Sequence, residues 1–357
     1  MRRLGANERL LLRQIRLRGS VAKADLARLT DLSTQTASVI INRLLEEKLV
    51  RKLEVQRGKV GQPSQPIALD PDGAYAIGIQ IGRRDLEVAL IDFTGVPRLR
   101  AGISYDSPDV ETVFAAIAQQ LDAVAASLGA EAAARICGVG VAAPLNFGAW
   151  EGLLRMSPLD AQAWSGVDIG RRVQALTALP VTFAKDTAAA CVAELVAGRG
   201  RGIDSYLYIF VDTLTGGGLV IGGRPHAGMH GNSGAIGSMP LRAGAPGQPG
   251  APAQLLSVAS LVTLESESAW LAEAADAIAY AVCNAACLVD LDAVIVDGKL
   301  ERALLGSLLA AVETALTRYN WEGAARPALH AGEVGADAKV IGAAYLSLHA
   351  SFAPAQG

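Results

Sequence analysis

The stretch VAKADLARLTDLSTQTASVIINRLLEEK, from Val21 to Lys48, decides the N-terminal part of the fold. It predicts a short amphipathic helix over 23–30, a tight connection, and a second helix capped by Ser33. The second helix repeats apolar residues with the spacing of one helical face, which predicts a single buried stripe. That stripe consists of Ala37, Ile40, Ile41, Leu44 and Leu45.

The opposite face of the second helix is polar and nearly free of acidic residues, unlike the alternating Lys and Glu of an ordinary surface helix. Its hydrogen-bonding side chains are Ser33, Thr34, Gln35, Thr36, Ser38, Asn42 and Arg43. Such side chains suit contacts with base edges in a DNA major groove. A helical hairpin in an ordinary globular core is the alternative, and the pattern alone does not separate the two.

A β-hairpin is predicted to follow the second helix. Strand-like runs at 49–55 and 67–69 flank a basic loop, Arg57-Gly58-Lys59-Val60-Gly61-Gln62-Pro63-Ser64. An earlier helix is predicted over 7–17. Three helices and a hairpin predict a winged helix-turn-helix domain over residues 1–70, with Arg57 and Lys59 placed on backbone phosphate or in the minor groove.

Charge is distributed unevenly along the chain. Residues 1–70 contain fourteen Lys and Arg against seven Asp and Glu, whereas the whole chain has a formal net charge of -3. The remainder is therefore strongly acidic. A basic N-terminal part on an acidic body indicates nucleic-acid binding confined to one end, and we predict double-stranded operator DNA as a partner.

The sequence predicts a cytoplasmic protein. The four cysteines, Cys137, Cys191, Cys283 and Cys287, show no metal-type spacing, which fits a reducing compartment. The N-terminal run has charges throughout and lacks the pattern of a signal peptide. No uninterrupted apolar run reaches the roughly 18 residues of a membrane span, so no membrane association is predicted.

The remaining residues, 71–357, predict an α/β body of two lobes. Strand signals come in threes and then alternate with helices, twice over, as in an internal duplication. Strands are predicted at 74–82, 85–92, 98–105, 136–142, 206–212, 217–221, 293–297 and 328–331, and helices at 110–128, 267–289, 302–319 and 338–349. Asp70–Gly73 is predicted to be a hinge between the N-terminal domain and the body.

Several motifs appear in a specific order. They are GIQIGRRDLEVALIDFTG (78–95), GVGVAAP (138–144), AKDTAAACVAELVAGRGRG (184–202), TGGGLVIGGRPHAGMHGNSGAIGSMPL (215–241) and LDAVIVDGKL (291–300). With the N-terminal domain, they make the chain resemble the ROK (repressor, open reading frame, kinase) family, and its repressor branch of N-acetylglucosamine and xylose regulators in particular. The resemblance implies an actin-like, ribonuclease H-like sugar-kinase fold, with ATP and sugar sites between two lobes.

The chain departs from the kinase members of this family at several positions. Gln80 replaces the Asp of the first phosphate loop, and the Gly-Gly-Thr that follows it in the kinases reads Gly82-Arg83-Arg84 here. Ala235 and Ser238 replace a sugar-binding Glu and a zinc-binding His, and Leu256 replaces a second sugar-binding Glu. The cysteines of the family's zinc site are absent, and His226 and His230 suit loop packing better than metal binding. We therefore predict no metal, no ATP and no other cofactor.

The resemblance matches Asp186 to the catalytic carboxylate of the kinases, whereas Lys185 stands where the family has a sugar-binding Asn. A cation beside Asp186 would hold it ionised and paired, which makes it a poorer base. We predict no catalytic residue. Asp186 is expected to cap a helix or to contact an effector together with Lys185.

These observations predict a DNA-binding transcriptional regulator, in the repressor branch, of carbohydrate-related genes. Its body would sense a small molecule such as a sugar or sugar derivative and would assemble as a homodimer or homotetramer. Two alternatives stay open: an ATP-dependent sugar kinase with a regulatory DNA-binding domain, and a DNA-binding protein without a ligand.

Overall fold

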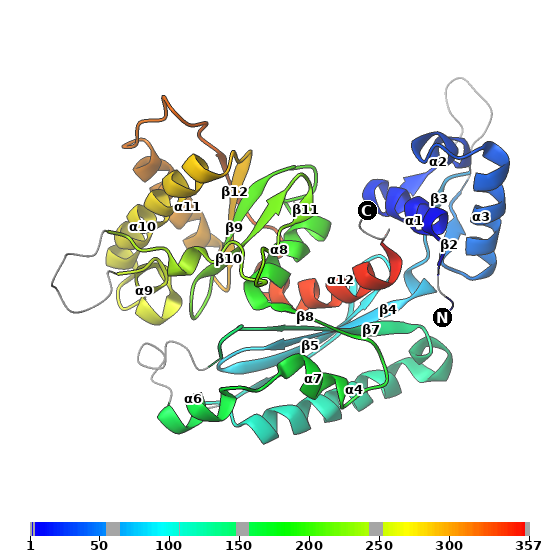
Figure 1. The fold of residues 1–357 in the computed structure, drawn as a ribbon, viewed down its shortest axis with the longest axis horizontal. Coiled ribbons are helices and arrows are strands. Elements are labelled where there is room, and N and C mark those ends of the chain that lie inside the picture. Colours follow the sequence, from blue (N-terminus) through cyan, green and yellow to red (C-terminus); the bar gives the residue numbers. More distant parts are fainter. Residues whose placement is uncertain are drawn as a thin grey trace.

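The computed structural model describes residues 2, 4–54, 65–106, 108–147, 157–242 and 253–353. Its strands form one sheet of three strands and two sheets of five strands. The small sheet belongs to the head, which we define as residues 1–70. The two large sheets belong to a first and a second lobe, and a pair of helices lies between these lobes (Figure 1).

The described residues of the head form three helices and a small antiparallel sheet with the strand order β1-β3-β2. Its elements are α1 (Ala6–Arg18), β1 (Ser20–Val21), α2 (Lys23–Leu29), α3 (Thr34–Glu46), β2 (Val50–Lys52) and β3 (Ile67–Leu69). The Ser33 hydroxyl accepts a hydrogen bond from the Thr36 amide at 3.1 Å, which caps α3 as predicted. Ala37, Ile41 and Leu44 are buried as the stripe predicts. The predicted wing loop lies in 55–64, outside the described residues, and Arg57 and Lys59 lie there too.

The first lobe is a sheet with the strand order β6-β5-β4-β7-β8, in which β7 runs parallel to both β4 and β8. Its strands are β4 (Tyr75–Ile81), β5 (Asp85–Asp92), β6 (Pro97–Ser104), β7 (Ile136–Ala143) and β8 (Val181–Lys185). Its outer helices are α4 (Val110–Ala133), α6 (Pro158–Trp164) and α7 (Ile169–Gln174). Alternation along β4 places Ile77 and Ile79 in a core with Phe114 of α4. The sequence analysis did not predict β8, α6 or α7.

The second lobe repeats this plan with the strand order β11-β10-β9-β12-β13. Its strands are β9 (Tyr206–Val211), β10 (Gly216–Ile221), β11 (Arg224–Pro225), β12 (Ala293–Gly298) and β13 (Ala328–Ala331). Its outer helices are α9 (Leu256–Ala259), α10 (Glu267–Leu288) and α11 (Arg302–Leu316). Along β9, Leu207 and Ile209 pack in the core of these outer helices, whereas Tyr206 and Tyr208 pack in the core that holds the central helices.

The central helices α8 (Asp186–Ala197) and α12 (Ala338–Phe352) approach their neighbours very closely. A Cβ atom at Gly140 would lie 1.7 Å from the Ala343 carbonyl oxygen, and one at Gly342 would lie 1.8 Å from that of Ala189. Only glycine fits at these two contacts. Short 3-10 turns at Pro71–Gly73, Ile236–Ser238, Leu261–Thr263 and Gly335–Asp337 complete the secondary structure.

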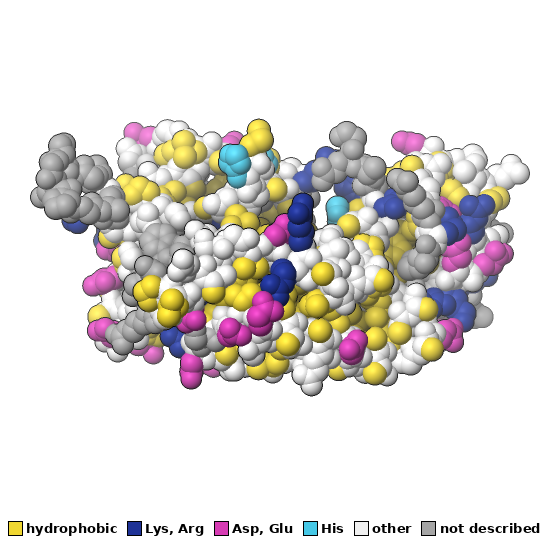
Figure 2. All heavy atoms as spheres, turned by 60° about the horizontal axis from the view of Figure 1, so that its bottom comes forward, with side chains coloured by type: hydrophobic (Ala, Val, Ile, Leu, Met, Phe, Trp, Pro, Cys, Tyr) yellow, Lys and Arg dark blue, Asp and Glu magenta, His cyan; other side chains and the backbone are white. Residues whose placement is uncertain are grey.

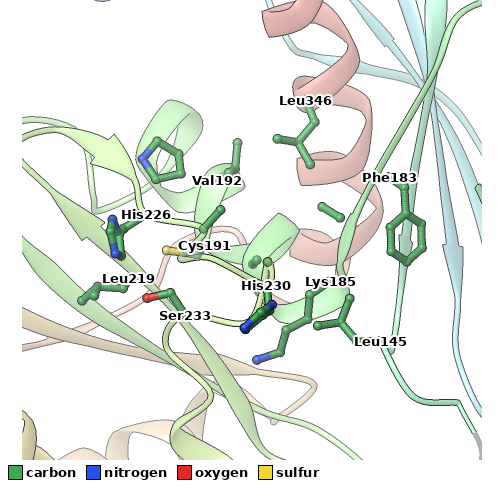
Figure 3. A pocket seen from close by; sticks show the side chains of 15 residues that line it. Leu145, Phe183, Lys185, Cys191, Val192, Leu219, His226, His230, Ser233 and Leu346 are labelled. Atoms are coloured by element: carbon green, nitrogen blue, oxygen red, sulfur yellow. The ribbon is translucent and has the colours of Figure 1, made fainter. Parts of the chain in front are cut away.

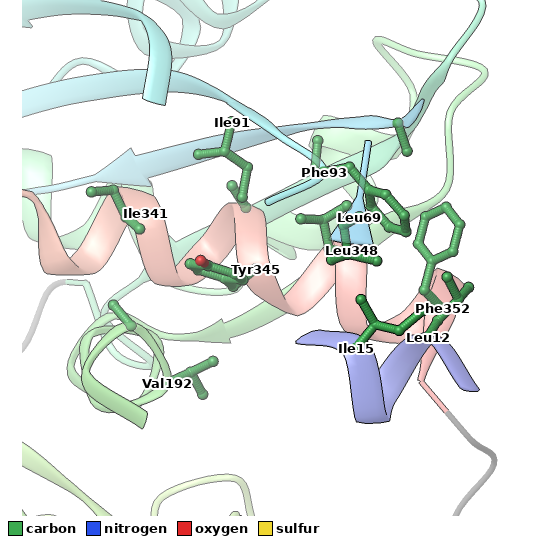
Figure 4. Packing of buried hydrophobic residues seen from close by; sticks show 14 of the residues in the cluster. Leu12, Ile15, Leu69, Ile91, Phe93, Val192, Ile341, Tyr345, Leu348 and Phe352 are labelled. Atoms are coloured by element: carbon green, nitrogen blue, oxygen red, sulfur yellow. The ribbon is translucent and has the colours of Figure 1, made fainter. Parts of the chain in front are cut away.

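The segment predicted as a hinge is a packed turn instead. The Phe93 amide donates to the Pro71 carbonyl at 3.0 Å, and a Cβ atom at Gly73 would lie 2.7 Å from the Lys48 carbonyl oxygen. The head and the end of α12 also share one apolar core, shown in Figure 4. It contains Leu12, Ile15 and Leu69 of the head with Phe93, Leu348 and Phe352 of the body. The head is therefore docked on the body through α12.

Two helices, α4 and α10, are long and apolar enough to cross a membrane by length and composition. The prediction that no membrane span is present counted only uninterrupted apolar runs, whereas these two helices contain polar residues among the apolar ones. In the structure α10 contributes buried residues to the core of the second lobe. The face of the first lobe that α4 helps to form carries apolar side chains interspersed with acidic and basic ones (Figure 2).

Candidate functional site between the lobes

A buried ion cluster joins the central helices to the second lobe. Lys339 of α12 donates to Asp186 Oδ2 and to Asp212 Oδ2, both at 2.8 Å from its Nζ. Asp186 opens α8, and Asp212 follows β9. The second oxygen of each carboxylate accepts a backbone amide, from Thr187 at 2.8 Å and from Thr213 at 2.7 Å. Each carboxylate oxygen therefore already has a protein donor.

The three charged groups of this cluster hold one another ionised, with two carboxylates sharing one ammonium. Burial alone would raise the pKa of Asp186 and of Asp212, but the Lys339 ammonium and the hydrogen bonds outweigh it, and both pKa values are lowered. Burial alone would likewise lower the pKa of Lys339, but the two carboxylates outweigh it and raise that pKa. The cluster consequently stays ionised at neutral pH.

Two further cations, one from each lobe, border the cluster. Arg83 donates to the Asn146 carbonyl at 3.2 Å and lies 5.8 Å from the centre of the Phe147 ring. Burial lowers the pKa of Arg83, and nearby Asp186 and Asp212 oppose this effect. Lys299, which follows β12, pairs with Asp85 at 2.5 Å and Glu87 at 3.0 Å on β5 and so links the two lobes.

The cation that pairs with Asp186 is Lys339, not Lys185, and this corrects the sequence prediction. The reason is that Lys185, at the end of β8, extends toward the Gly217 carbonyl at 3.5 Å instead. Asp186 is 9% exposed. It is the first residue of α8, and its Oδ1 accepts the Thr187 backbone amide at 2.8 Å, so it satisfies one of the free amides at the start of this helix.

Lys185 lines a pocket next to the cluster, which Figure 3 shows from close by. The pocket has a volume of about 300 Å³ and lies among β8, α8, α12, β10 and the segment 225–233. Its apolar walls include Phe183, Val192, Leu219 and Leu346. Its polar side chains are Lys185, His226, His230 and Ser233, and its sulfur atom belongs to Cys191. Asp186 does not line it.

Lys339 and the role of Asp212 were missed by the sequence analysis. One signal was available: Lys339 interrupts the buried face of an otherwise apolar helix, AKVIGAAYLSLHASF. A lysine at such a position is almost always paired. In the described part of the chain, no three His, Cys, Asp or Glu side chains are grouped so as to hold a metal ion.

In the head, the predicted polar face of α3 is exposed to solvent. Thr34, Gln35, Asn42 and Arg43 are exposed, and Ser38 is half-buried. Ser33 and Thr36 bond to each other, with hydroxyl oxygens 2.8 Å apart. These two hydroxyls therefore already serve the start of α3. Val39 adds an exposed apolar side chain to the same face.

Arg43 also has a structural contact. Its Nη1 atom lies 3.4 Å from Glu8, a buried carboxylate that closes the start of α1 and also pairs with Arg2. Hydrogen bonding by Arg2 is the main cause that lowers the pKa of Glu8 to about 2. The Lys23 ammonium lies 3.4 Å from the Asn42 side-chain oxygen. Among the described residues, the exposed Gln35 side chain forms no hydrogen bond to another side chain.

Comparison with known proteins finds relatives among regulators. The chain is 29% identical over 235 residues to an uncharacterized protein, y4fQ, of Sinorhizobium fredii, covering 64% of this chain and 58% of that one. It is 23% identical over 242 residues to the xylose repressor of Bacillus subtilis, covering 67% and 62%. The chain thus spans about three fifths of the length of these curated relatives.

Solved structures extend the likeness to the head. A ROK family transcriptional regulator, described as a homolog of the Escherichia coli Mlc protein, superposes with a TM-score of 0.71 at 19% identity and covers 97% of both chains. A ROK hexokinase from Thermus thermophilus superposes with a TM-score of 0.57 at 22% identity and covers 77% of this chain and 99% of its own. The predicted two-lobed sugar-kinase fold is confirmed. The ROK family model matches residues 76–254, which is just over half of this chain, and the chain therefore belongs to the ROK family.

Proposed function

We propose that the protein is a DNA-binding transcriptional regulator whose α3 reads operator DNA. The exposed polar face of α3 is the observation that carries this proposal. The fold that presents it matches that of a ROK transcriptional regulator over 97% of the chain. Gln35 and Asn42 lie on this face, and amides of this kind pair with adenine edges in the major groove. The excess of Lys and Arg in residues 1–70 supplies the attraction to phosphate.

The names of relatives support a repressor of carbohydrate-related genes, since two of them are a xylose repressor and the repressor Mlc. A regulator of this kind acts in the cytoplasm on double-stranded DNA and binds as a two-fold dimer. We place the contact between protomers of a homodimer or homotetramer in the body, because the apolar residues of the head are used in its own core and in docking on α12.

The body would control the head through α12. This helix carries Lys339 in the ion cluster, Leu346 in the pocket and Phe352 in the core shared with the head. A ligand that binds the body more tightly when α12 is in one position shifts the equilibrium toward that position, by as much as its difference in binding free energy allows. The head would move with α12. This route replaces the hinge at Asp70–Gly73, which the structure shows as a packed turn.

The alternative of an ATP-dependent sugar kinase is favoured by the hexokinase fold alone. Against it, Asp186 is paired with Lys339, and a carboxylate whose pKa is lowered in this way is a weak general base. We therefore propose that the protein is not an enzyme and needs neither ATP, Mg²⁺ nor zinc.

Selection of bound duplexes from a random DNA pool by the full chain tests this function. The proposal expects enrichment of a two-fold symmetric sequence with half-sites about 34–36 Å apart or a multiple of this spacing. A parallel assay measures ADP release from Mg-ATP with hexoses. Absence of enrichment, or hexose-dependent ADP release that Asp186→Asn abolishes, would contradict the proposal.

A further inference from the structure

The pocket beside the ion cluster has mostly apolar walls and one lysine, Lys185 (Figure 3). Phe183, Val192, Leu219 and Leu346 form walls on β8, α8, β10 and α12. The cavity of about 300 Å³ is at the lower end of the range for small-molecule sites. Because its walls come from both lobes and from the central helices, a molecule inside it would contact all of these parts at once.

Lys185 is the charged group of this pocket. Its ammonium has one long hydrogen bond, 3.5 Å to the Gly217 carbonyl, and forms no ion pair with any described residue. The nearby Asp186 carboxylate is engaged by Lys339. Burial lowers the pKa of Lys185, and the charge of Asp186 only partly opposes this. A partly buried cation without a partner is unfavourable, and an anion that pairs with it relieves this cost.

The pocket is poorly suited to a neutral sugar. A sugar presents hydroxyl groups all around its ring, and each one that is buried needs a hydrogen-bond partner. Most of the wall is apolar. Of the positions where the ROK resemblance places sugar-binding groups, the pocket includes Lys185, where a lysine replaces the family's Asn, but neither 235 nor 256.

We propose that this pocket binds a small monoanion with an apolar body, a monocarboxylate, whose charge pairs with Lys185 and whose apolar part lies against Val192, Leu219 and Leu346. His230 and Ser233 at the same pocket offer hydrogen bonds to the second carboxylate oxygen. The role of this ligand as an effector rests on the proposed function, because only a DNA-binding head gives α12 something to control. Binding itself does not depend on that function.

Calorimetry with benzoate and hexanoate, and with the neutral isosteres benzamide and hexanamide, tests the proposal on the full chain. At least one carboxylate is expected to bind with a Kd on the order of 1 mM or tighter. Its amide is expected to bind at least about tenfold more weakly, because it lacks the charge-assisted bond to Lys185. Glucose serves as the polyol comparison and is expected not to bind in this pocket.

Two variants make the result specific. Lys185→Met is expected to remove the preference for carboxylate over amide, whereas Lys52→Met, an exposed lysine of the head, leaves it unchanged. Leu219→Trp fills the cavity and is expected to abolish binding of both members of a pair, with folding checked by thermal unfolding. Failure of both carboxylates to bind, equal affinities for acid and amide, or unchanged binding in Leu219→Trp would overturn the proposal. Enrichment of DNA by the same preparation would show that the proposed function survives that failure.

Discussion

The ion cluster and the pocket lie next to each other along α8, yet they treat charge in opposite ways. In the cluster, Lys339 lies between two carboxylates, and all three groups are almost fully buried. In the pocket, the half-buried Lys185 side chain has one long hydrogen bond, to a carbonyl group. The first region is complete without a ligand. The second leaves a cation for which the described chain supplies no anion.

Asp186 illustrates our proposal that this chain keeps a catalytic-type carboxylate without using it for catalysis. Asp186 holds the position that the ROK resemblance assigns to the base, but Lys339 neutralises it from α12. The interaction ties α12 to the start of α8 and to the residue that follows β9. A residue at the matching position is therefore weak evidence of catalysis unless its partners are known.

Removing the central cation should have the largest effect on stability. Lys339→Met leaves Asp186 and Asp212 buried without their common partner, and we expect a loss of about 3–5 kcal/mol in the free energy of unfolding. Urea unfolding followed by circular dichroism measures it. The triple variant Lys339→Met, Asp186→Asn, Asp212→Asn should recover part of this loss, because no buried carboxylate is then left without its cation. Equal stability of wild type and Lys339→Met would mean that the cluster is not formed.

Acid should remove the stabilising effect of the cluster. The pKa values of Asp186 and Asp212 are lowered in the folded chain, so their contribution is present in full above the unfolded value of about 3.9 and is lost as the pH falls through the folded values. Unfolding free energies at neutral pH and near pH 3, for wild type and the triple variant, test this. The difference between the two proteins should shrink at low pH. Glu8, whose pKa is lowered to about 2, contributes equally to both and cancels. A difference that is independent of pH would refute the assignment.

The matched change in the pocket should have the smallest effect. Lys185→Met removes a half-buried cation that has no ion pair with any described residue, so the free energy of unfolding should stay the same or rise by no more than about 1 kcal/mol. The same urea titration measures it beside Lys339→Met. A loss as large as that of Lys339→Met would show that Lys185 has a structural partner, and the contrast between the two regions would disappear.

Much of the fold could be predicted because it depends on local patterns. The polar and apolar faces of α3, the cap at Ser33 and the two runs of three strands are all visible within short windows of sequence. The strand β8 was missed because it is short and only half-buried, so it lacks the strong apolar signal of β4 or β9. The hinge was inferred from Asp-Pro-Asp-Gly alone, and its packing against Phe93 depends on residues far along the chain.

The site was harder to predict than the fold. Lys185 directly precedes Asp186 in sequence, and this adjacency suggested an ion pair, but successive residues at the end of a strand point in different directions. The true partner, Lys339, is 153 positions away from Asp186 and becomes its neighbour only through the packing of α12 on α8. The resemblance to a family identified the position of Asp186, and only the structure identified its charge partner.

The affinity of Gln35→Ala for the duplex enriched by the wild-type chain tests the central claim most directly. Fluorescence anisotropy at fixed salt should show a loss of about 1–3 kcal/mol and a weaker preference for that duplex over an unrelated one. Gln119→Ala, an exposed glutamine on α4 in the body, is the matched control and should bind like the wild type. Unchanged affinity and preference in Gln35→Ala would contradict the claim that α3 reads operator DNA.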